Sequence, residues 1–330
     1  MAHKYTAIDL FAGGGGTALG LDLAGFSHLA VNEKAKDPAA TLRKNRPGWN
    51  IIEGDLSKIS FTDFHNKVDL VEGGFPCQAF SYAGKRAGLD DVRGTMFYEF
   101  ARTVKEVNPK LAMGENVKGL LTHNKGQTFS SMLSVMTELG YRNYWQVMDS
   151  SLYGVPQKRE RLILVCVRED LKGDFEFPLP AAKPMTLQEG IGDRPTAPGH
   201  NYNDSKKKIL DLIPAGGNWK SLPKELQDSY LGGATRGKGG MTGFAKRLSW
   251  DQPAPTLMCS PMQKSTERCH PDETRPLNIR EYARIQSFPD SWEFSGGLTS
   301  QYKQIGNAVP VNLSKEIGYA LINFLETQAK

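Results

Sequence analysis

An alternation of short β-type runs with helical patterns, from residue 5 to about 170, constrains the fold most. The first run, 5–11, leads into the glycine turn Gly13-Gly14-Gly15-Gly16, and a helical pattern follows over 17–24. Alternation of this kind is typical of a mostly parallel sheet with helices on both faces. Further strand patterns cover 27–32, 49–53, 68–71, 110–113, 141–148 and 162–167, and helical patterns cover 38–45 and 97–107. The sequence therefore predicts an α/β domain whose ligands bind beyond the carboxyl ends of its strands.

The chain has 330 residues, which is longer than a typical single domain. From 178 to 275 it is rich in glycine and proline and has few periodic segments. Such a composition predicts a smaller module built from loops and irregular or β structure. Helical patterns return at 277–285 and 311–327. We therefore expect a first domain over 1–177, a second over 178–275 and a C-terminal segment over 276–330.

Several classes of protein are disfavoured. The sequence has no run of 18 apolar residues and no signal-peptide core near its start, so we expect a cytoplasmic protein. Its four cysteines form no CxxC pair, which argues against a disulfide framework. Cys259, Cys269 and His270 would supply three zinc ligands, but no fourth is evident, and we expect no metal site. The net charge of +5 is compatible with nucleic-acid binding and with many other functions.

The glycine turn and two acidic residues predict a nucleotide-type cofactor site. The turn lets backbone approach a ligand closely, and the helix after it offers free N–H groups. Glu33 lies at the end of the second strand pattern, where a carboxylate binds ribose hydroxyl groups. Asp55 follows the third strand and could accept a hydrogen bond from an adenine amino group. These features allow NAD, FAD or S-adenosylmethionine, and the lack of a nearby arginine favours the ligand without phosphates.

Reactive groups follow two further strand patterns. Cys77 comes shortly after 68–71, and Glu115 ends the run that begins at 110. A thiolate that adds to an electron-poor ring, with a carboxyl group that supplies a proton, forms a site for covalent catalysis. Arg159 and Arg161 precede the last strand pattern and could orient the carboxyl group and the ring.

These blocks resemble, in order, the signature of the cytosine-5 DNA methyltransferases of the single-chain, bacterial restriction-modification type. The matching blocks are Phe75-Pro76-Cys77-Gln78, Arg93-Gly94-Thr95-Met96-Phe97, Glu115-Asn116-Val117, Gln157-Lys158-Arg159-Glu160-Arg161, the helical block 280–289 and Gln304-Ile305-Gly306-Asn307-Ala308-Val309-Pro310. The resemblance covers nearly the whole chain outside 178–275. It implies a Rossmann-like, S-adenosylmethionine-dependent methyltransferase domain, a target-recognition domain over 178–275 and a C-terminal segment that returns to the catalytic domain.

The resemblance also implies a mechanism and its residues. The enzyme flips a cytosine out of a short specific duplex sequence, Cys77 adds to ring carbon 6, and carbon 5 takes the methyl group. The implied catalytic residues are Cys77, Glu115, Arg159 and Arg161. The implied cofactor-binding residues are Phe11, Gly13, Gly15, Gly16, Glu33, Lys34, Asp55, Leu56, Pro76, Met96, Asn307 and Ala308. Lys34 departs from the family, because this position is often an aromatic residue that stacks on adenine.

Double-stranded DNA is the expected substrate, a companion restriction endonuclease a possible partner, and a monomer the expected state. The candidate DNA-binding residues are Ser81, Lys85, Arg86, Arg236, Lys238, Lys246 and Arg247. One alternative is a transfer-RNA cytosine-5 methyltransferase, although a large variable module suits duplex DNA better. Another is a catalytically inactive DNA-binding regulator, which the presence of Cys77, Glu115 and Arg159 disfavours. A dehydrogenase would leave Cys77 and Glu115 unexplained.

Overall fold

The computed structural model describes residues 4–75, 95–231 and 243–328. The chain forms two compact units, each described by itself. The first unit comprises Met1–Asp149, Glu160–Pro180 and Val309–Lys330, and the second comprises Ser150–Arg159 and Ala181–Ala308. These bounds differ from the expected ones chiefly at the C-terminal end, where the chain rejoins the first unit at 309 and not at 276.

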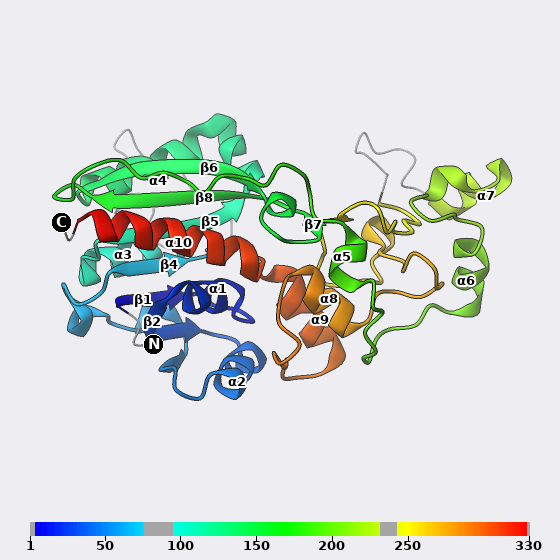
Figure 1. Ribbon diagram of the computed structural model, residues 1–330, viewed down its shortest axis with the longest axis horizontal. Helices are drawn as coiled ribbons and strands as arrows, with labels where there is room; N and C mark the ends of the chain where they lie inside the picture. Colours follow the sequence, from blue (N-terminus) through cyan, green and yellow to red (C-terminus); the bar gives the residue numbers. More distant parts are fainter. Residues whose placement is uncertain (1–3, 76–94, 232–242, 329–330) are drawn as a thin grey trace. The chain divides into compact units, whose positions relative to one another are not determined.

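The first unit is built on a seven-stranded sheet with strand order β3-β2-β1-β4-β5-β8-β6 (Figure 1). Its strands are β1 (Tyr5–Leu10), β2 (Phe26–Glu33), β3 (Ile51–Glu53), β4 (Leu70–Gly73), β5 (Leu111–Val117), β6 (Tyr141–Asp149) and β8 (Glu160–Arg168). Neighbouring strands from β3 to β5 are parallel, whereas β8 is antiparallel to both β5 and β6. The mostly parallel α/β sheet is as predicted. The strand order changes direction between β1 and β4, where open α/β sheets bind ligands.

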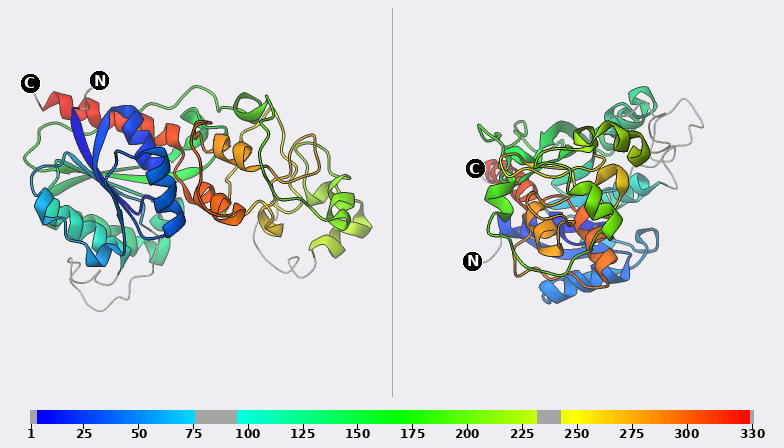
Figure 2. Two further views of the ribbon diagram at one scale, coloured as in Figure 1. Left: turned by 90° about the horizontal axis from the view of Figure 1, so that it is seen from below. Right: turned by 90° about the vertical axis from the view of Figure 1, so that its right-hand side faces the viewer.

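Helices cover both faces of this sheet, as Figure 2 shows for the first unit. They are α1 (Gly16–Ala24), α2 (Lys36–Asn45), α3 (Met96–Val107), α4 (Gln127–Glu138) and α10 (Val311–Thr327), with short 3-10 turns η1 (Leu56–Lys58), η2 (Thr62–Phe64), η4 (Lys118–Leu121) and η5 (His123–Gly126). The sequence patterns did not indicate α4, which is rich in serine and threonine and starts after Gly126 at φ +85°. Among the described residues, no helix combines the length and apolarity that a membrane span requires.

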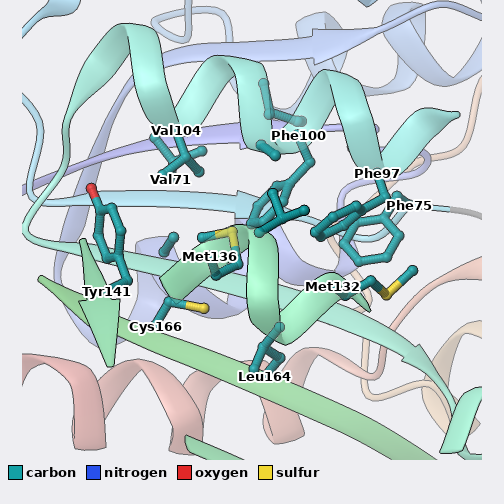
Figure 3. Packing of buried hydrophobic residues seen from close by; sticks show 14 of the residues in the cluster. Val71, Phe75, Phe97, Phe100, Val104, Met132, Met136, Tyr141, Leu164 and Cys166 are labelled. Atoms are coloured by element: carbon teal, nitrogen blue, oxygen red, sulfur yellow. The ribbon is translucent and has the colours of Figure 1, made fainter. Parts of the chain in front are cut away.

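The main hydrophobic core lies between the sheet and helices α3 and α4 (Figure 3). The ring centroid of Phe75 lies 5.3 Å from that of Phe97 and 5.4 Å from that of Phe100. Cys166 is fully buried in β8, and burial raises the pKa of its thiol. This packing fixes Phe75, the last described residue before Cys77.

Helices α1 and α10 pack closely against each other although nearly 300 residues separate them. A Cβ atom on Gly20 would lie 2.5 Å from the Cβ of Ser314, and one on Gly318 would lie 2.6 Å from that of Ala24. Only glycine at these positions lets the two backbones approach so closely. The C-terminal helix is therefore an integral part of the first unit.

The second unit is mostly irregular. Its helices are α5 (Leu187–Ile191), α6 (Asp204–Leu210), α7 (Lys224–Leu231), α8 (Ile279–Ile285) and α9 (Leu298–Asn307), with short turns η6 (Ser150–Leu152), η7 (Trp219–Ser221) and η9 (Lys264–Thr266). A two-stranded sheet pairs β7 (Gln157–Lys158) with β9 (Ala254–Pro255). Capping boxes start both α5 and α8: Thr186 pairs with Glu189, and Asn278 with Glu281. Short, well-capped helices on irregular backbone match the composition of this segment.

Candidate functional site

The turn between β1 and α1 has the geometry of a ligand-binding glycine turn. Phe11, Gly13 and Gly15 all have positive φ, at 59°, 55° and 90°. The N–H of Gly15 donates to the carbonyl of Ala12 at 2.9 Å, which closes the turn. At Gly13 and Gly15, glycine adopts this left-handed backbone without strain and leaves room for a ligand to approach closely. Gly16 is the first residue of α1, so free helix N–H groups lie next to this turn.

Glu33 holds the glycine turn from the end of β2. Its Oε2 accepts a hydrogen bond from the N–H of Gly13 at 2.7 Å, and its Oε1 accepts one from the N–H of Ala35 at 2.6 Å. The side chain is largely buried. The structure thus brings together Gly13 and Glu33, two of the expected cofactor-binding residues, which are 20 positions apart in the sequence. Each carboxylate oxygen still has lone pairs for a ribose hydroxyl group.

Asp55 and Lys34 form an ion pair beside this turn. The Lys34 Nζ lies 2.7 Å from Asp55 Oδ2, while Asp55 Oδ1 accepts from the N–H of Ser57 at 3.1 Å and from its hydroxyl at 2.8 Å. Lys34 and Ser57 lower the pKa of Asp55 to about 2. Leu56, the next residue, is buried. The lysine that replaces an aromatic residue therefore binds the acid that was expected to accept from adenine.

Two buried acidic residues that we did not single out from the sequence lie on neighbouring strands. Asp9 of β1 and Glu72 of β4 stand opposite each other in the parallel ladder. Their side chains are 0% and 1% exposed, and no other described group hydrogen-bonds to either oxygen of Asp9 or to Oε1 of Glu72. Acidic residues inside apolar strand runs, as in Ile8-Asp9-Leu10, were the available signal.

The charge of the acidic groups at this site indicates which of the three cofactors fits it. Asp9, Glu72, Glu33 and Asp55 all lie at or near the carboxyl ends of the parallel strands. A phosphate group would meet repulsion from buried carboxylates, whereas a cationic ligand without phosphates would not. The residues present therefore fit S-adenosylmethionine, whose sulfonium and ammonium groups are positive, better than NAD or FAD.

Glu115 and Arg161 form a largely buried ion pair across β5 and β8. The Arg161 Nε lies 2.7 Å from Glu115 Oε1, with exposed side-chain fractions of 12% and 14%. Burial lowers the pKa of Arg161, and Glu115 partly offsets this effect. A Cβ on Gly74 would lie 3.4 Å from Glu115 Oε2, so the carboxylate reaches the backbone that leads to Cys77. The structure thus unites two of the expected catalytic side chains.

Asn116 connects β5 to the same backbone. Its Nδ2 donates to the carbonyl of Phe75 at 2.8 Å, and its Oδ1 accepts from the N–H of Val117 at 2.9 Å. Phe75 is two positions before Cys77. Cys77 itself lies outside the described residues, as do Pro76, Ser81, Lys85, Arg86, Arg236 and Lys238. Met96 starts α3, and its side chain packs against the main core.

Arg159 lies in the second unit and is buried. Its Nη1 donates to the carbonyl of Leu257 at 3.2 Å and its Nη2 to that of Gly306 at 3.1 Å. Gly306 precedes Asn307, the last residue of α9, and Ala308. The Oδ1 of Asn307 accepts from the exposed Cys259 thiol at 2.9 Å. Within its own unit, Arg159 thus supports the backbone just before Asn307 and Ala308, two of the expected cofactor-binding residues.

Arg247 requires a correction, because it was expected to contact DNA. It is 5% exposed, and its guanidinium donates to the carbonyls of Ile213 at 2.7 Å and Leu210 at 2.8 Å and to the hydroxyl of Thr274 at 2.7 Å. A buried guanidinium that stabilises irregular backbone is not available to a phosphate. Lys246 is half-buried, and its Nζ donates to the carbonyl of Gly216 at 2.5 Å.

Comparisons with known proteins agree with the geometry. The family described as C-5 cytosine-specific DNA methylase matches residues 5–323. The chain is 51% identical over 98% of its length to the type II methyltransferase M.Eco47II of Escherichia coli, of which it covers 80%. It is 49% identical over 100% of its length to M.PspPI of Psychrobacter sp. strain TA137, covering 82%, and 48% identical over 97% to M.Sau96I of Staphylococcus aureus, covering 76%.

Solved structures show the same fold. A mutant of Spodoptera frugiperda DNMT2 superposes with a TM-score of 0.68 at 17% identity, over 97% of this chain and 100% of that one. The Dnmt2 methyltransferase of S. pombe gives 0.62 at 18% identity, over 98% of each chain. At these identities the likeness concerns the fold alone. The family match and the relatives at about 50% identity show that this chain belongs to the C-5 cytosine-specific DNA methylase family.

Proposed function

We propose that this chain is a type II methyltransferase that modifies one cytosine within a short duplex sequence and protects that sequence from a companion restriction endonuclease. Family membership makes it a DNA cytosine-5 methyltransferase that uses S-adenosylmethionine. The type II assignment is supported by the names of relatives that cover nearly the whole chain. We further expect a cytoplasmic monomer.

The Glu115–Arg161 ion pair is the observation that carries the proposed chemistry. Arg161 fixes one carboxylate oxygen, and the other lies against Gly74, three positions before Cys77. We propose that Cys77 adds as a thiolate to carbon 6 of the flipped cytosine while Glu115 holds a proton at ring nitrogen 3. Arg161 positions Glu115 for this role. Charge that develops on the ring is thereby neutralised, and carbon 5 becomes nucleophilic.

S-adenosylmethionine supplies the electrophilic methyl group when bound. The residues proposed to hold it in the first unit are Phe11, Gly13, Gly15, Gly16, Glu33, Asp55, Leu56 and Met96. Glu33 would bind the ribose hydroxyl groups, and Asp55 would exchange its contact with Lys34 for the adenine amino group. Pro76, Asn307 and Ala308 remain further candidates. We propose that Arg159 acts through the backbone of Gly306 and does not touch the base.

We propose that the second unit selects the DNA sequence and that the first carries the chemistry. The irregular backbone of the second unit supports this division, because loops adapt to base edges and phosphates more readily than regular elements do. Arg236 and Lys238, outside the described residues, and the half-buried Lys246 remain candidates for DNA contact. Ser81, Lys85 and Arg86 remain candidates in the first unit.

Expression in a host without cytosine methylation tests the proposal. We expect bisulfite sequencing of host DNA to show protected cytosines in one short motif for the wild type and none for Cys77→Ala. Cofactor binding by Cys77→Ala should stay near normal, because loss of the thiol leaves the glycine turn intact. Protected cytosines in RNA but not in DNA would favour the transfer-RNA alternative. No protection in either would favour an inactive DNA-binding protein.

A further inference from the structure

The buried pair of Asp9 and Glu72 has no part in the chemistry described above. Both side chains are at most 1% exposed, and they face each other across adjacent parallel strands. Residues Ile8, Leu10 and Val71 belong to the core on the α3 and α4 side. Because side chains alternate along a strand, Asp9 and Glu72 point to the opposite face of the sheet. They lie there just before the glycine turn and before the segment that leads to Cys77.

The surroundings of the pair contain further negative charge. Glu33 from β2 acts on Asp9, and Glu115 from β5 acts on Glu72. Arg161 from β8 is paired with Glu115. The first turns of α1 and α10, the helices that pack together in this unit, carry no charged residue. Among the described residues, the pair therefore has no cation of its own.

Two buried acidic groups this close do not ionise together near neutral pH. Burial raises the pKa of Asp9 to about 7, although the contact with Glu72 works in the opposite direction. Burial and the charge of Asp9 raise the pKa of Glu72 well above its ordinary value. Asp9 therefore gains its negative charge at about pH 7, and the raised pKa of Glu72 opposes a second negative charge beside it.

We propose that Asp9 and Glu72 together hold a single negative charge beneath the glycine turn, and that this charge makes the site favour the cationic methyl donor over its neutral product. The inference rests on the proposed placement of the cofactor at that turn. When the methyl group leaves, the electron pair of its bond stays on sulfur, and the sulfonium becomes an uncharged thioether. The attraction to the pair then disappears, which promotes release of the product. Asp9 and Glu72 are thus positioning residues for charge and make no bond in the reaction.

Binding measured without DNA tests the inference. Calorimetry would give the affinities of the wild type for S-adenosylmethionine and S-adenosylhomocysteine at about pH 6 and about pH 8.5, on either side of the pKa of Asp9. The double variant Asp9→Asn/Glu72→Gln removes the charge with little change of shape. Any pH dependence that it still shows comes from other groups, including those of the ligands, and serves as the reference for the wild type. We expect the donor-to-product affinity ratio of the wild type to rise about fivefold more across this interval than that of the double variant.

Two further variants separate charge from structure. In Glu72→Gln the amide can donate to Asp9, so Asp9 should ionise at lower pH, and the preference for the donor should persist with little pH dependence. Asp174→Asn removes an acid whose side chain is 82% exposed and should match the wild type. Equal affinity ratios in the wild type and the double variant at both pH values would overturn the inference. It would also be overturned if the double variant lost affinity for S-adenosylmethionine and S-adenosylhomocysteine by the same factor.

If the double variant does not fold, the comparison of wild type with Glu72→Gln decides, and identical pH profiles would overturn the inference. Methylation of DNA by the wild type is measured separately. If the wild type methylates DNA normally but has the same donor-to-product affinity ratio as the double variant, the charge role is rejected and the proposed function stands. The expected ratio without methylation of any DNA would reject the proposed function alone.

Discussion

The two units use buried charge in different ways. In the first unit, acidic groups gather at one edge of a regular sheet, where Glu33 binds the glycine turn and Glu115 binds Arg161. In the second unit, buried charges replace the hydrogen bonds that regular structure would provide. Glu267, fully buried, accepts from the hydroxyl of Tyr230 at 2.6 Å and from the N–H of Ala245 at 2.7 Å. Arg247 likewise donates hydrogen bonds to carbonyl groups of irregular backbone. Among the described residues, buried charged groups lie at the proposed reactive site only in the first unit, where the regular sheet already provides hydrogen bonds to the backbone.

The comparison predicts the largest loss of activity at Glu115. Glu115→Gln keeps the size of the side chain but removes its acid–base function, and we expect the methylation rate to fall by about 10²- to 10⁴-fold. Cofactor affinity should change little. Glu160→Gln is a matched control, because Glu160 is next in sequence to Arg161 and forms an exposed ion pair with Lys118 at 3.0 Å. Single-turnover rates on DNA would check both variants, and an unchanged rate for Glu115→Gln would remove this residue from the chemistry.

A charge in the second unit should instead affect stability. Arg247→Ala leaves several buried carbonyl groups without donors, and we expect the free energy of unfolding to fall by about 3 kcal/mol. Lys246→Ala, next in sequence and half-buried, should cost about 1 kcal/mol or less. Chemical denaturation monitored by circular dichroism would measure both. If Arg247→Ala kept full stability and lost only DNA affinity, the contrast between the two units would be wrong.

The smallest effect is expected at Lys34. Lys34→Tyr would release Asp55 from its ion pair and offer an aromatic ring to adenine. Stacking on an aromatic side chain contributes about 1 kcal/mol at an exposed site, so we expect about fivefold tighter cofactor binding. Lys34→Met removes the ion pair without supplying the ring and separates the two contributions. Calorimetric titration would decide, and weaker binding by both variants would show that Lys34 itself contacts the cofactor.

Much of the first unit could be predicted from sequence because its signals are local. Gly13 and Glu33 stand at strand ends that hydrophobic runs reveal, and a parallel sheet brings such ends to one edge. The pairing of Asp9 with Glu72 could not be predicted, because it depends on the register of strands more than 60 positions apart. The reversal of β8 relative to β5 has no local signal either.

The second unit was predictable only in its irregularity. Arg247 was predicted to bind DNA, as was its neighbour Lys246, because nothing periodic around them in the sequence distinguishes buried from exposed positions. Its burial follows from backbone carbonyls at Leu210, Ile213 and His270 that need donors. The locations of these groups depend on the folded loops and not on neighbouring residues. Charge in an irregular segment is therefore weak evidence for a binding surface.

An exchange of the second unit tests the central claim most directly. Residues 181–308, the longer of the two segments of this unit, would be replaced by the matching segment of a family member that modifies a different DNA sequence, and Ser150–Arg159 would be kept. The methylated cytosines would be mapped by bisulfite sequencing. We predict that the chimaera still methylates cytosine at carbon 5 but does so in the donor's target sequence. A folded chimaera that kept the original target would show that the first unit selects the sequence and would contradict this account.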